Sequence, residues 1–542
     1  MNGIVDQLKK NWISALSVAL VSVPLSLSLS IASGAGPVAG VITAIWAGLF
    51  AGIFGGSKFN IVGPAGALAG ILASIAFVYG AAVLPLIAIV SGFMILVVWF
   101  FKWDRYLIFV PSAVVHGFTL GVALTIGFGQ LNFALGLKDL PKHEHLISNI
   151  LESLKHIAFS QTWSVIPFIV GLGLMFTILK YKPRWPNTVI VAALGILFGY
   201  LTSIGTIPLT IDTLFTKFGD LILRPFNIPT LSRDMFNQVI FQYSAVVAFV
   251  VVLETLISAK IADGMTKTKF KQRKEVLGVG LANIAAGIFG GIPASGVFAR
   301  TAINVKSGAT SNWSQIINAV FVAILAMVLL PGFKFIPLSV IAAILVYASI
   351  RMVATHHFKK LYKFDRSAFW ISMAVAIITV VYDATAGILV GTLLALLVFA
   401  RKLSSAQCNV TINEEDGQTD ATEVLNENVK GKEVVYRFAG ELTYINAKSH
   451  IERLQRISSD SAIVLNFRNL FYIDVDGIEA LDEIIEDLDR RNQSVFVTGV
   501  NENIMKFVKD HEWFKKLVHE NRVLTTTDAA IAQSKTISLK NL

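Results

Sequence analysis

The chain has 542 residues, of which 54% are hydrophobic and only 15% are charged. A soluble domain of this length does not need such a balance, so the composition indicates an integral membrane protein. The net charge is +10 at pH 7, but the basic residues cluster between apolar stretches, as topology signals do, which argues against a nucleic-acid surface. The single cysteine, Cys408, excludes an internal disulfide.

Apolar stretches long enough to span or half-span a bilayer recur along the chain. A first set falls at about 12–33, 37–54, 64–79, 83–101, 112–135, 164–180 and 187–204. A second set falls at about 238–260, 275–290, 296–308, 315–331, 336–351, 368–382 and 385–401. Because each set holds an odd number of segments, the second is expected to lie inverted relative to the first. Inverted repeats are the architecture of alternating access.

Basic residues predict the orientation of these segments. They gather in the connections that lie inside if the N-terminus is inside, around 102–105, 180–184, 267–274, 351–366 and 401–402. Both termini are then cytoplasmic, in the plasma (inner) membrane. The long outer connections, about 136–163 and 205–237, are expected to be solvated surface, and Asp383 to be a turn residue at the outer mouth. Lys9 and Lys10 precede a span too long for a cleavable signal peptide.

Glycine and proline break the apolar pattern at equivalent places in the two sets. The hexapeptide AGIFGG occurs at 51–56 and again at 286–291, and each copy leads into a broken segment, 61–67 (IVGPAGA) and 290–300 (GGIPASGVFAR). We expect a half-helix to start near Gly296, with its free N–H groups and positive dipole end facing inward and Arg300 one turn in. Such tips are anion sites in transporters, although small residues also serve simply to pack helices closely.

Glu254 lies in the middle of a span, with Ser258 one turn later on the same face. A carboxyl group there marks a functional site, because burial favours its neutral form and so allows it to bind and release a proton. The alternative is that Glu254 pairs with Arg300 or caps a neighbouring backbone break. His116 is interpreted as a packing histidine, and one of Ser26, Ser28 and Ser30 is expected to line a cavity.

The composition changes abruptly after the last span. Residues 404–432 are polar and acidic and predict a linker, whereas 433–535 alternate strand and helix patterns typical of a soluble α/β domain. No nucleophile elbow, Walker A motif or His/Cys cluster with metal spacing occurs in the sequence. The chain is therefore not expected to be an enzyme or an ATP-driven pump.

With these motifs in view, the chain resembles the sulfate permease (SulP) family of anion transporters. The resemblance rests on 33–37 (SGAGP), the break at 62–64, 253–265 and 290–301, and 465–477 resembles a STAS domain. It implies a polytopic α-helical membrane protein of fourteen segments in a 7+7 inverted repeat, with core and gate domains like those of uracil permease, an elevator movement, and a cytoplasmic α/β STAS domain. The expected domains are 1–403 for transport (repeats at about 12–204 and 238–401), a linker at 404–432, and STAS at 433–535.

The resemblance also implies site residues. The family's anion site lies between the third and tenth segments, which here gives a substrate-binding set of Ala65, Gly66, Gly296, Val297, Phe298 and Arg300. Cyanobacterial bicarbonate members look similar, and they bind sodium with an Asp and a Thr where this chain has Glu254 and Ser258. Sodium at Glu254, Ser258 and Gly296 is therefore one expectation. A Glu resembles proton-coupled members, so the coupling ion stays open between Na⁺ and H⁺, with no other cofactor.

Two departures from the family pattern matter. Leu25 follows Pro24 where many members have Gln, which leaves anion selectivity open. In the STAS segment Asp476 occupies the phosphorylatable serine position, so switching by serine phosphorylation is excluded and the domain is expected to serve assembly or regulation, in a homodimer.

The sequence thus predicts a secondary active transporter of sulfate or bicarbonate, by H⁺ or Na⁺ symport. The alternatives are an anion channel or exchanger, a dicarboxylate transporter, and a membrane-tethered STAS scaffold with a vestigial core.

Overall fold

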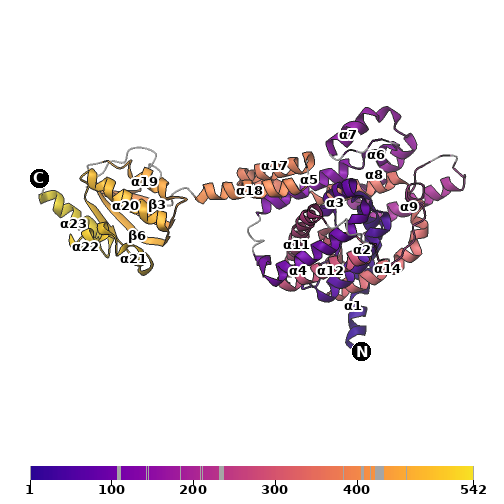
Figure 1. Cartoon of the computed structure of the whole chain (residues 1–542), viewed down its shortest axis with the longest axis horizontal. Helices are drawn as coiled ribbons and strands as arrows, with labels where there is room; N and C mark the ends of the chain where they lie inside the picture. The colour runs from indigo at the N-terminus through magenta and orange to yellow at the C-terminus, as the bar shows by residue number, and fades with distance from the viewer. Residues whose placement is uncertain are drawn as a thin grey trace. The chain divides into compact units, whose positions relative to one another are not determined.

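The computed structural model describes most of the chain; the residues outside its description are 1, 106–110, 139, 142, 144–145, 183–184, 208, 210, 227, 231–236, 354, 383, 404–407, 415–416, 421–432, 459–460 and 541–542. The described residues form two compact units, Met1–Ala395 and Leu396–Leu542, which are treated separately (Figure 1). The predicted turn at Asp383 and most of the predicted linker lie outside the described residues.

The first unit is helical, and every predicted span contains at least one helix. The first repeat comprises α1 (Asn2–Ala32), α2 (Pro37–Phe54), α3 (Gly66–Tyr79), α4 (Leu84–Phe100), α5 (Ser112–Phe128), α8 (Thr162–Tyr181) and α9 (Asn187–Ser203). The second comprises α11 (Gln238–Thr266), α12 (Gln272–Ile288), α13 (Phe298–Lys306), α14 (Trp313–Phe333), α15 (Leu338–Met352), α17 (Arg366–Val381) and α18 (Ala384–Leu403). Among the described residues, eight helices are long and apolar enough to cross a membrane.

Some boundaries differ from the prediction. The stretch 112–135 is not one helix: α5 ends at Phe128, and a separate short helix, α6 (Leu131–Leu135), follows Gly129. Helix α11 continues to Thr266, beyond the predicted end at 260, because the helical backbone extends past the last residue of the apolar pattern. The predicted outer connections contain the helices α7 (Leu146–Lys155), η3 (Ile157–Phe159) and α10 (Leu214–Phe218).

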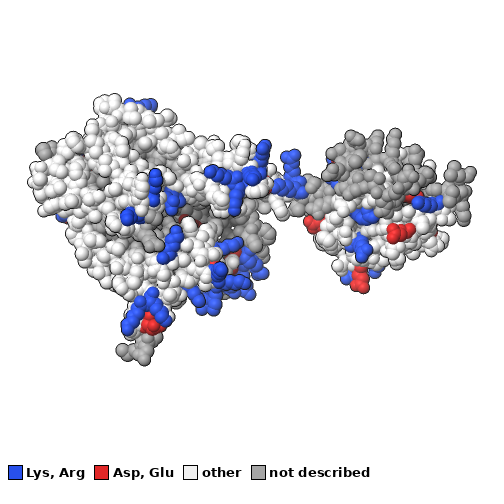
Figure 2. All heavy atoms as spheres, turned by 180° about the vertical axis from the view of Figure 1, so that it is seen from behind, with Lys and Arg blue, Asp and Glu red and all other residues white. Residues whose placement is uncertain are grey.

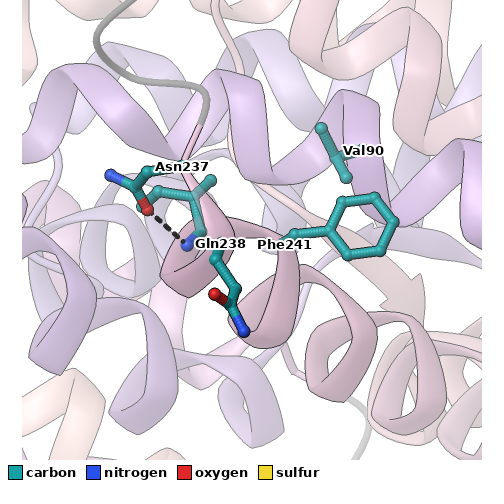
Figure 3. A pocket seen from close by; sticks show the side chains of 5 residues that line it. Val90, Asn237, Gln238 and Phe241 are labelled. Atoms are coloured by element: carbon teal, nitrogen blue, oxygen red, sulfur yellow. Dashed lines mark hydrogen bonds between the residues drawn. The ribbon is translucent and has the colours of Figure 1, made fainter.

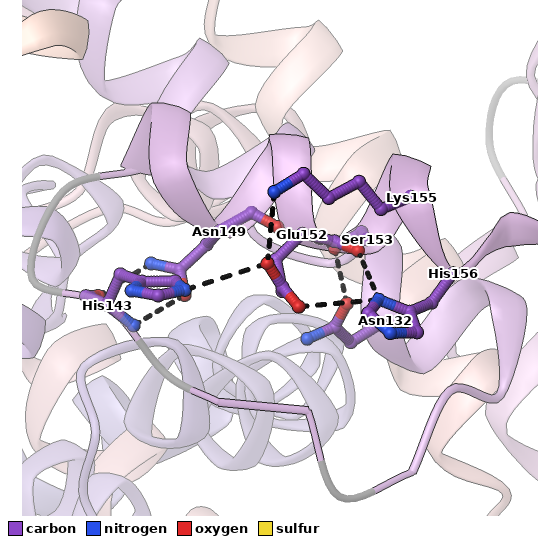
Figure 4. Close-up of polar contacts among 7 residues, drawn as sticks. All are labelled: Asn132, His143, Asn149, Glu152, Ser153, Lys155 and His156. Atoms are coloured by element: carbon purple, nitrogen blue, oxygen red, sulfur yellow. Dashed lines mark hydrogen bonds and ion pairs between the residues drawn. The ribbon is translucent and has the colours of Figure 1, made fainter.

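Helix α7 is organised around Glu152, which two histidines and a lysine surround (Figure 4). The carboxylate lies 3.4 Å from His156 Nδ1 and 3.9 Å from both His143 Nε2 and Lys155 Nζ. On the neighbouring turn, Ser153 Oγ donates to the Asn132 side chain, which ties α7 to α6. This predicted outer connection therefore contains a helix that is held to α6.

Glycines let the helices that carry the second break pack tightly against the first repeat. Helix α12 packs against both α2 and α4. A Cβ atom on Gly92 of α4 would lie 2.7 Å from the carbonyl oxygen of Gly280 of α12, so only glycine permits this approach.

The second unit is an α/β domain built on a six-stranded sheet of order β4-β3-β5-β6-β7-β8. The strands are β3 (Cys408–Glu414), β4 (Gly417–Asp420), β5 (Glu433–Leu442), β6 (Ala462–Ile473), β7 (Val495–Thr498) and β8 (Val523–Leu524), with α19 (Ala447–Leu454), α20 (Val475–Arg490), α21 (Glu502–Val508), α22 (Glu512–His519) and α23 (Thr527–Lys540). Strands β5 to β8 are parallel, and β3 and β4 form an antiparallel edge. Their apolar residues form the domain core.

The assignment of all of 404–432 to a linker was wrong. Strand β3 pairs with β5 from Cys408 to Asn413, and β4 pairs back onto β3, so the sheet begins before residue 433. The polar, acidic composition of 404–432 hid these strands, although Cys408, Val410 and Ile412 alternate as buried residues along β3. The strand and helix patterns predicted after 433 correspond to β5, α19, β6, α20, β7 and α21.

Candidate functional site

The two broken segments meet as a short antiparallel ladder. Strand β1 (Val62–Pro64) pairs with β2 (Ala294–Gly296), with Val62 opposite Gly296 and Pro64 opposite Ala294. The Val297 amide adds a hydrogen bond of 2.8 Å to the Ile61 carbonyl oxygen. Because the strands run in opposite directions, α3 and α13 leave from opposite ends of the ladder, and their positive N-terminal ends flank it.

Side chains from neighbouring helices bond to the ladder's outer edges. Asn283 donates to the Ala294 carbonyl and accepts from its amide, at 2.9 and 2.8 Å. Gln315 does the same for Val62, at 3.3 Å for each bond, and Thr255 Oγ1 accepts from the Gly296 amide at 2.9 Å. These bonds replace the hydrogen bonds that the helix breaks remove, so the ladder can persist inside an apolar bundle.

Arg300, in the first turn of α13, is 1% exposed. Its Nη2 donates to the Pro64 carbonyl oxygen at 3.2 Å and to Ser26 Oγ at 3.3 Å, whereas its Nε has no partner among the described residues. No carboxylate of the described chain forms an ion pair with it. The guanidinium is thus a buried positive charge supported only by neutral dipoles, and such a charge is costly without an anion.

The predicted substrate residues are brought together around the ladder, but the two tips differ. Ala65 and Gly66, at the start of α3, are buried, and a Cβ atom on Gly66 would meet the Met352 sulfur at 2.9 Å and Ile126 at 3.2 Å. At the start of α13, by contrast, Phe298 is 48% exposed. The first residue of α3 is therefore covered by α5 and α15, whereas the first side chain of α13 is exposed.

Glu254 lies beside the ladder and is half-buried. It accepts a hydrogen bond from Ser295 Oγ of β2 and makes no ion pair with Arg300 within the described chain. Ser258 does not bond to Glu254 there; its hydroxyl donates to Asn60 Oδ1 at 2.7 Å and to Thr301 Oγ1 at 3.2 Å. Of the predicted cation set, only Glu254 thus contacts the ladder through its side chain, while Gly296 belongs to the ladder itself.

The sequence reasoning missed Glu275, which is a second, fully enclosed carboxylate. Its Oε2 accepts from the Gly56 and Ser57 amides at 2.8 and 2.7 Å, and its Oε1 accepts from Asn60 Nδ2 at 2.7 Å. Asn60 in turn accepts from Ser258 and Thr301, so this network joins both repeats beneath the ladder. Glu275 directly follows the basic run 267–274, so the sequence analysis treated this stretch as a topology signal and overlooked the carboxylate. Asn283, a polar residue inside a span, was the available clue to the side chains that support the ladder.

Two surface cavities lie away from the ladder. One of about 310 Å³ lies where α11 begins and is lined by Val90, Asn237, Gln238, Ile240 and Phe241 (Figure 3). Another, of about 440 Å³, is walled mainly by apolar side chains of α5, α6, α8 and α15. No predicted site residue lines either cavity.

His116 stacks on His357 with ring centres 4.4 Å apart, in keeping with a packing role. No group of three His, Cys, Asp or Glu residues that could hold a metal ion occurs in the described chain.

Two family models match the chain. The model of the sulfate permease family matches residues 8–375, and that of the STAS domain matches 424–529. The chain is similar to "Putative sulfate transporter YvdB" of Bacillus subtilis (strain 168), with 29% identity covering 94% of this chain and 95% of that protein. It is 24% identical to the bicarbonate transporter BicA of Synechocystis sp. (strain ATCC 27184 / PCC 6803 / Kazusa), covering 78% and 74%.

A solved structure extends the likeness to the fold. The murine Solute Carrier 26 family member A9 anion transporter in the inward-facing state superposes with a TM-score of 0.82 at 13% identity, covering 98% of this chain and 92% of that one. This similarity supports the 7+7 membrane fold followed by a STAS domain.

Proposed function

Because the chain belongs to the sulfate permease family, we propose that it is a secondary active transporter of a small inorganic anion, sulfate or bicarbonate. The observation that carries the proposal is Arg300. It is buried at a helix N-terminus, and among the described residues its guanidinium donates hydrogen bonds only to the neutral partners Pro64 and Ser26 and retains an unpartnered Nε. A bound anion would supply the missing negative charge, and the first amides of α3 and α13 would stabilise it from either end of the ladder.

The proposed substrate set is the one predicted from the sequence, Ala65, Gly66, Gly296, Val297, Phe298 and Arg300. Backbone dipoles at two helix tips recognise negative charge more than anion identity. This supports the coarse choice of a small anion and leaves the difference between sulfate and bicarbonate to be decided by size and hydration.

Glu254 is the proposed coupling residue, and it binds either H⁺ or Na⁺. Its carboxylate contacts Ser295, which directly precedes Gly296, so a change of charge on Glu254 acts on the same strand that leads into α13. In the sodium alternative, the Ser258 hydroxyl would have to leave Asn60, with which it now forms a hydrogen bond. In either case transport follows an elevator movement in which the ladder and its helices move together.

Transport by purified protein in liposomes tests this proposal. We expect uptake of ³⁵S-sulfate or ¹⁴C-bicarbonate to accumulate against its gradient when an inward proton or sodium gradient is imposed. The Glu254→Gln variant keeps an oxygen that can accept from Ser295, and we expect it to move the anion only down its gradient. Full gradient dependence in this variant would remove the coupling role, and single-channel currents far above carrier turnover would establish a channel instead.

We further propose that the protein is a homodimer in the plasma (inner) membrane, with both termini cytoplasmic. The basic connections support this orientation. Labelling of the native Cys408 in intact and permeabilised cells tests it: modification by a charged maleimide only after permeabilisation and denaturation is expected.

A further inference from the structure

Helix α16 (Thr355–Phe364), between α15 and α17, is short, basic and exposed. It contains no buried residue, and only Phe358 and Leu361, three positions apart on one face, are half-buried. The exposed lysines Lys359 and Lys363 are four positions apart and so share the opposite face, with Lys360 beside them. The helix is thus amphipathic, with its apolar side against the protein.

Large aromatic side chains flank this basic face. Tyr362 is 56% exposed and Phe364 is 78% exposed, and Trp370, in the second turn of α17, is 65% exposed. Lys363 Nζ lies 5.5 Å from the Phe364 ring centre, and the Arg366 guanidinium lies 5.7 Å from that of Tyr362. Exposed aromatics interleaved with lysines are typical of segments that lie in the interface of a bilayer.

The charge of this face is not neutralised by the protein. Within the described chain, Lys359, Lys360 and Lys363 form no ion pair with a carboxylate. In Figure 2 most of the visible surface of the first unit is uncharged, and its Lys and Arg side chains gather in a few groups with little acidic surface between them. A basic face of this kind, on a helix next to spanning helices, fits a surface of fixed negative charge.

We propose that α16 lies in the membrane interface and that its lysines bind the headgroups of anionic phospholipids. Tyr362, Phe364 and Trp370 would enter the outer part of the acyl region, while Lys359, Lys360 and Lys363 contact phosphate groups. This lipid site is separate from the site of the transported anion at the ladder. Each lysine close to an anionic surface strengthens such binding roughly fivefold.

The helix is connected to the transport machinery through aromatic stacking. His357 of α16 stacks on His116 of α5, and Phe358 lies edge-on to the same ring at 6.5 Å between centres. Helix α5 also carries Ile126, which covers Gly66 at the tip of α3. Lipid binding on α16 therefore stabilises the position of α5, and through it the cover over the first helix tip.

Lipid selectivity measured by electron paramagnetic resonance tests the binding directly, without relying on transport. The full-length protein is reconstituted with spin-labelled phosphatidylglycerol or spin-labelled phosphatidylcholine. We expect the immobilised fraction of wild-type protein to favour phosphatidylglycerol by at least about fivefold, and the triple variant Lys359→Gln, Lys360→Gln and Lys363→Gln to lose most of that preference.

The matched control changes Lys506, Lys509 and Lys515 of the α/β domain to Gln, which removes the same charge from exposed sites outside the first unit. This control should keep the wild-type preference. Equal selectivity in all three proteins would overturn the proposal, as would the absence of any preference in the wild type. If an acidic protein segment occupied the basic face instead of lipid, the wild type would show no preference for phosphatidylglycerol.

Depth measurement provides a second readout that does not depend on affinity. In a Cys408→Ser background, spin labels placed by Lys360→Cys and Phe364→Cys are compared for access to oxygen and to a water-soluble nickel complex. The proposal requires the label at 364 to lie deeper than that at 360. Full water access at both positions would contradict it. Transport in phosphatidylglycerol vesicles is then expected to be about threefold faster than in phosphatidylcholine for wild type, and equal in the two lipids for the triple variant.

Discussion

The tips of α3 and α13 are built by the same backbone device but carry different chemistry. Each follows a three-residue strand of one ladder, and each begins with an apolar N-cap, Ala65 or Val297. Three residues after the N-cap, α3 has the buried Leu68, whereas α13 has the buried Arg300. The inverted repeat therefore duplicates the helix dipole, but a full charge is present on one side only.

The covers of the two tips differ as well. Met352 and Ile126 lie against Gly66, while Phe298 is largely exposed. In the proposed anion site, the second repeat would supply the full charge, and the first tip would become available only if α5 and α15 moved relative to α3.

Replacing the charged residue should have the largest effect. We expect Arg300→Gln to lower the kcat/KM for the anion about 100-fold, about 2.7 kcal/mol, because no other full positive charge among the described residues stands at the ladder. The matched change on the other tip, Leu68→Met, preserves volume and should stay within about twofold. Initial-rate uptake in liposomes over a range of anion concentrations measures both. Equal losses would show that the two tips contribute alike.

The first repeat also positions the arginine, through Gly63. A Cβ atom there would lie 2.6 Å from Arg300 Nη1, so Gly63→Ala has to displace the guanidinium. We expect uptake to fall about 30-fold, mainly as a higher KM. Gly70→Ala is the control, because its nearest neighbour would be Thr125 Cγ2 at an ordinary 3.5 Å. An unchanged KM in Gly63→Ala would mean that Arg300 need not be held in this place.

Replacing Gly296 or Gly66 by alanine should distinguish a glycine packed against backbone from one packed against a flexible side chain. On Gly296 a Cβ atom would meet Asn60 Nδ2 at 2.6 Å and the Thr255 Cα at 2.9 Å, and the backbone cannot yield easily. On Gly66 it meets the end of the flexible Met352 side chain. We expect about a tenfold loss of uptake for Gly296→Ala and about threefold for Gly66→Ala. Adding Met352→Ala should restore only the Gly66 variant.

The smallest effect on transport is expected from the α/β domain, where His450 is enclosed. Burial, and then the positive charge of Arg453, lower the pKa of His450 from 6.5 to about 3. The unfolded chain therefore takes up this proton at higher pH. The stabilisation from the neutral ring is complete above about pH 6.5 and is lost as the pH falls toward 3.

We expect His450→Gln, whose amide can still accept from the Tyr436 hydroxyl, to flatten this pH dependence while leaving anion uptake unchanged. Hydrogen exchange of β5 and α19 amides in the full-length protein at pH 7.5 and pH 5 measures the stability. An altered pH profile of anion uptake in this variant would contradict the expectation that His450 acts on the stability of the α/β domain alone.

Much of the membrane fold could be predicted from local patterns. The broken segments were visible because glycine and proline cannot continue a spanning helix, and the repeated hexapeptide placed them in register. The linker assignment failed at β3 and β4 because the polar, acidic composition of 404–432 outweighed the short apolar alternation of Cys408, Val410 and Ile412 in β3. Glu275 was missed because its neighbours in sequence are lysines and an arginine, whereas its neighbours in space are the Asn60 side chain and backbone amides.

The sequence alone determined the membrane class, the two sets of seven segments, the two helix breaks and the presence of Arg300 and Glu254 near them. These follow from hydropathy, helix length and backbone chemistry, which are local properties. Only the tertiary structure decided that Arg300 has no carboxylate partner among the residues it describes, that Ser258 bonds there to Asn60 and not to Glu254, and that the start of α3 is covered. Those facts depend on contacts between residues about 40 to 290 positions apart, and such contacts are set by the packing of the whole bundle.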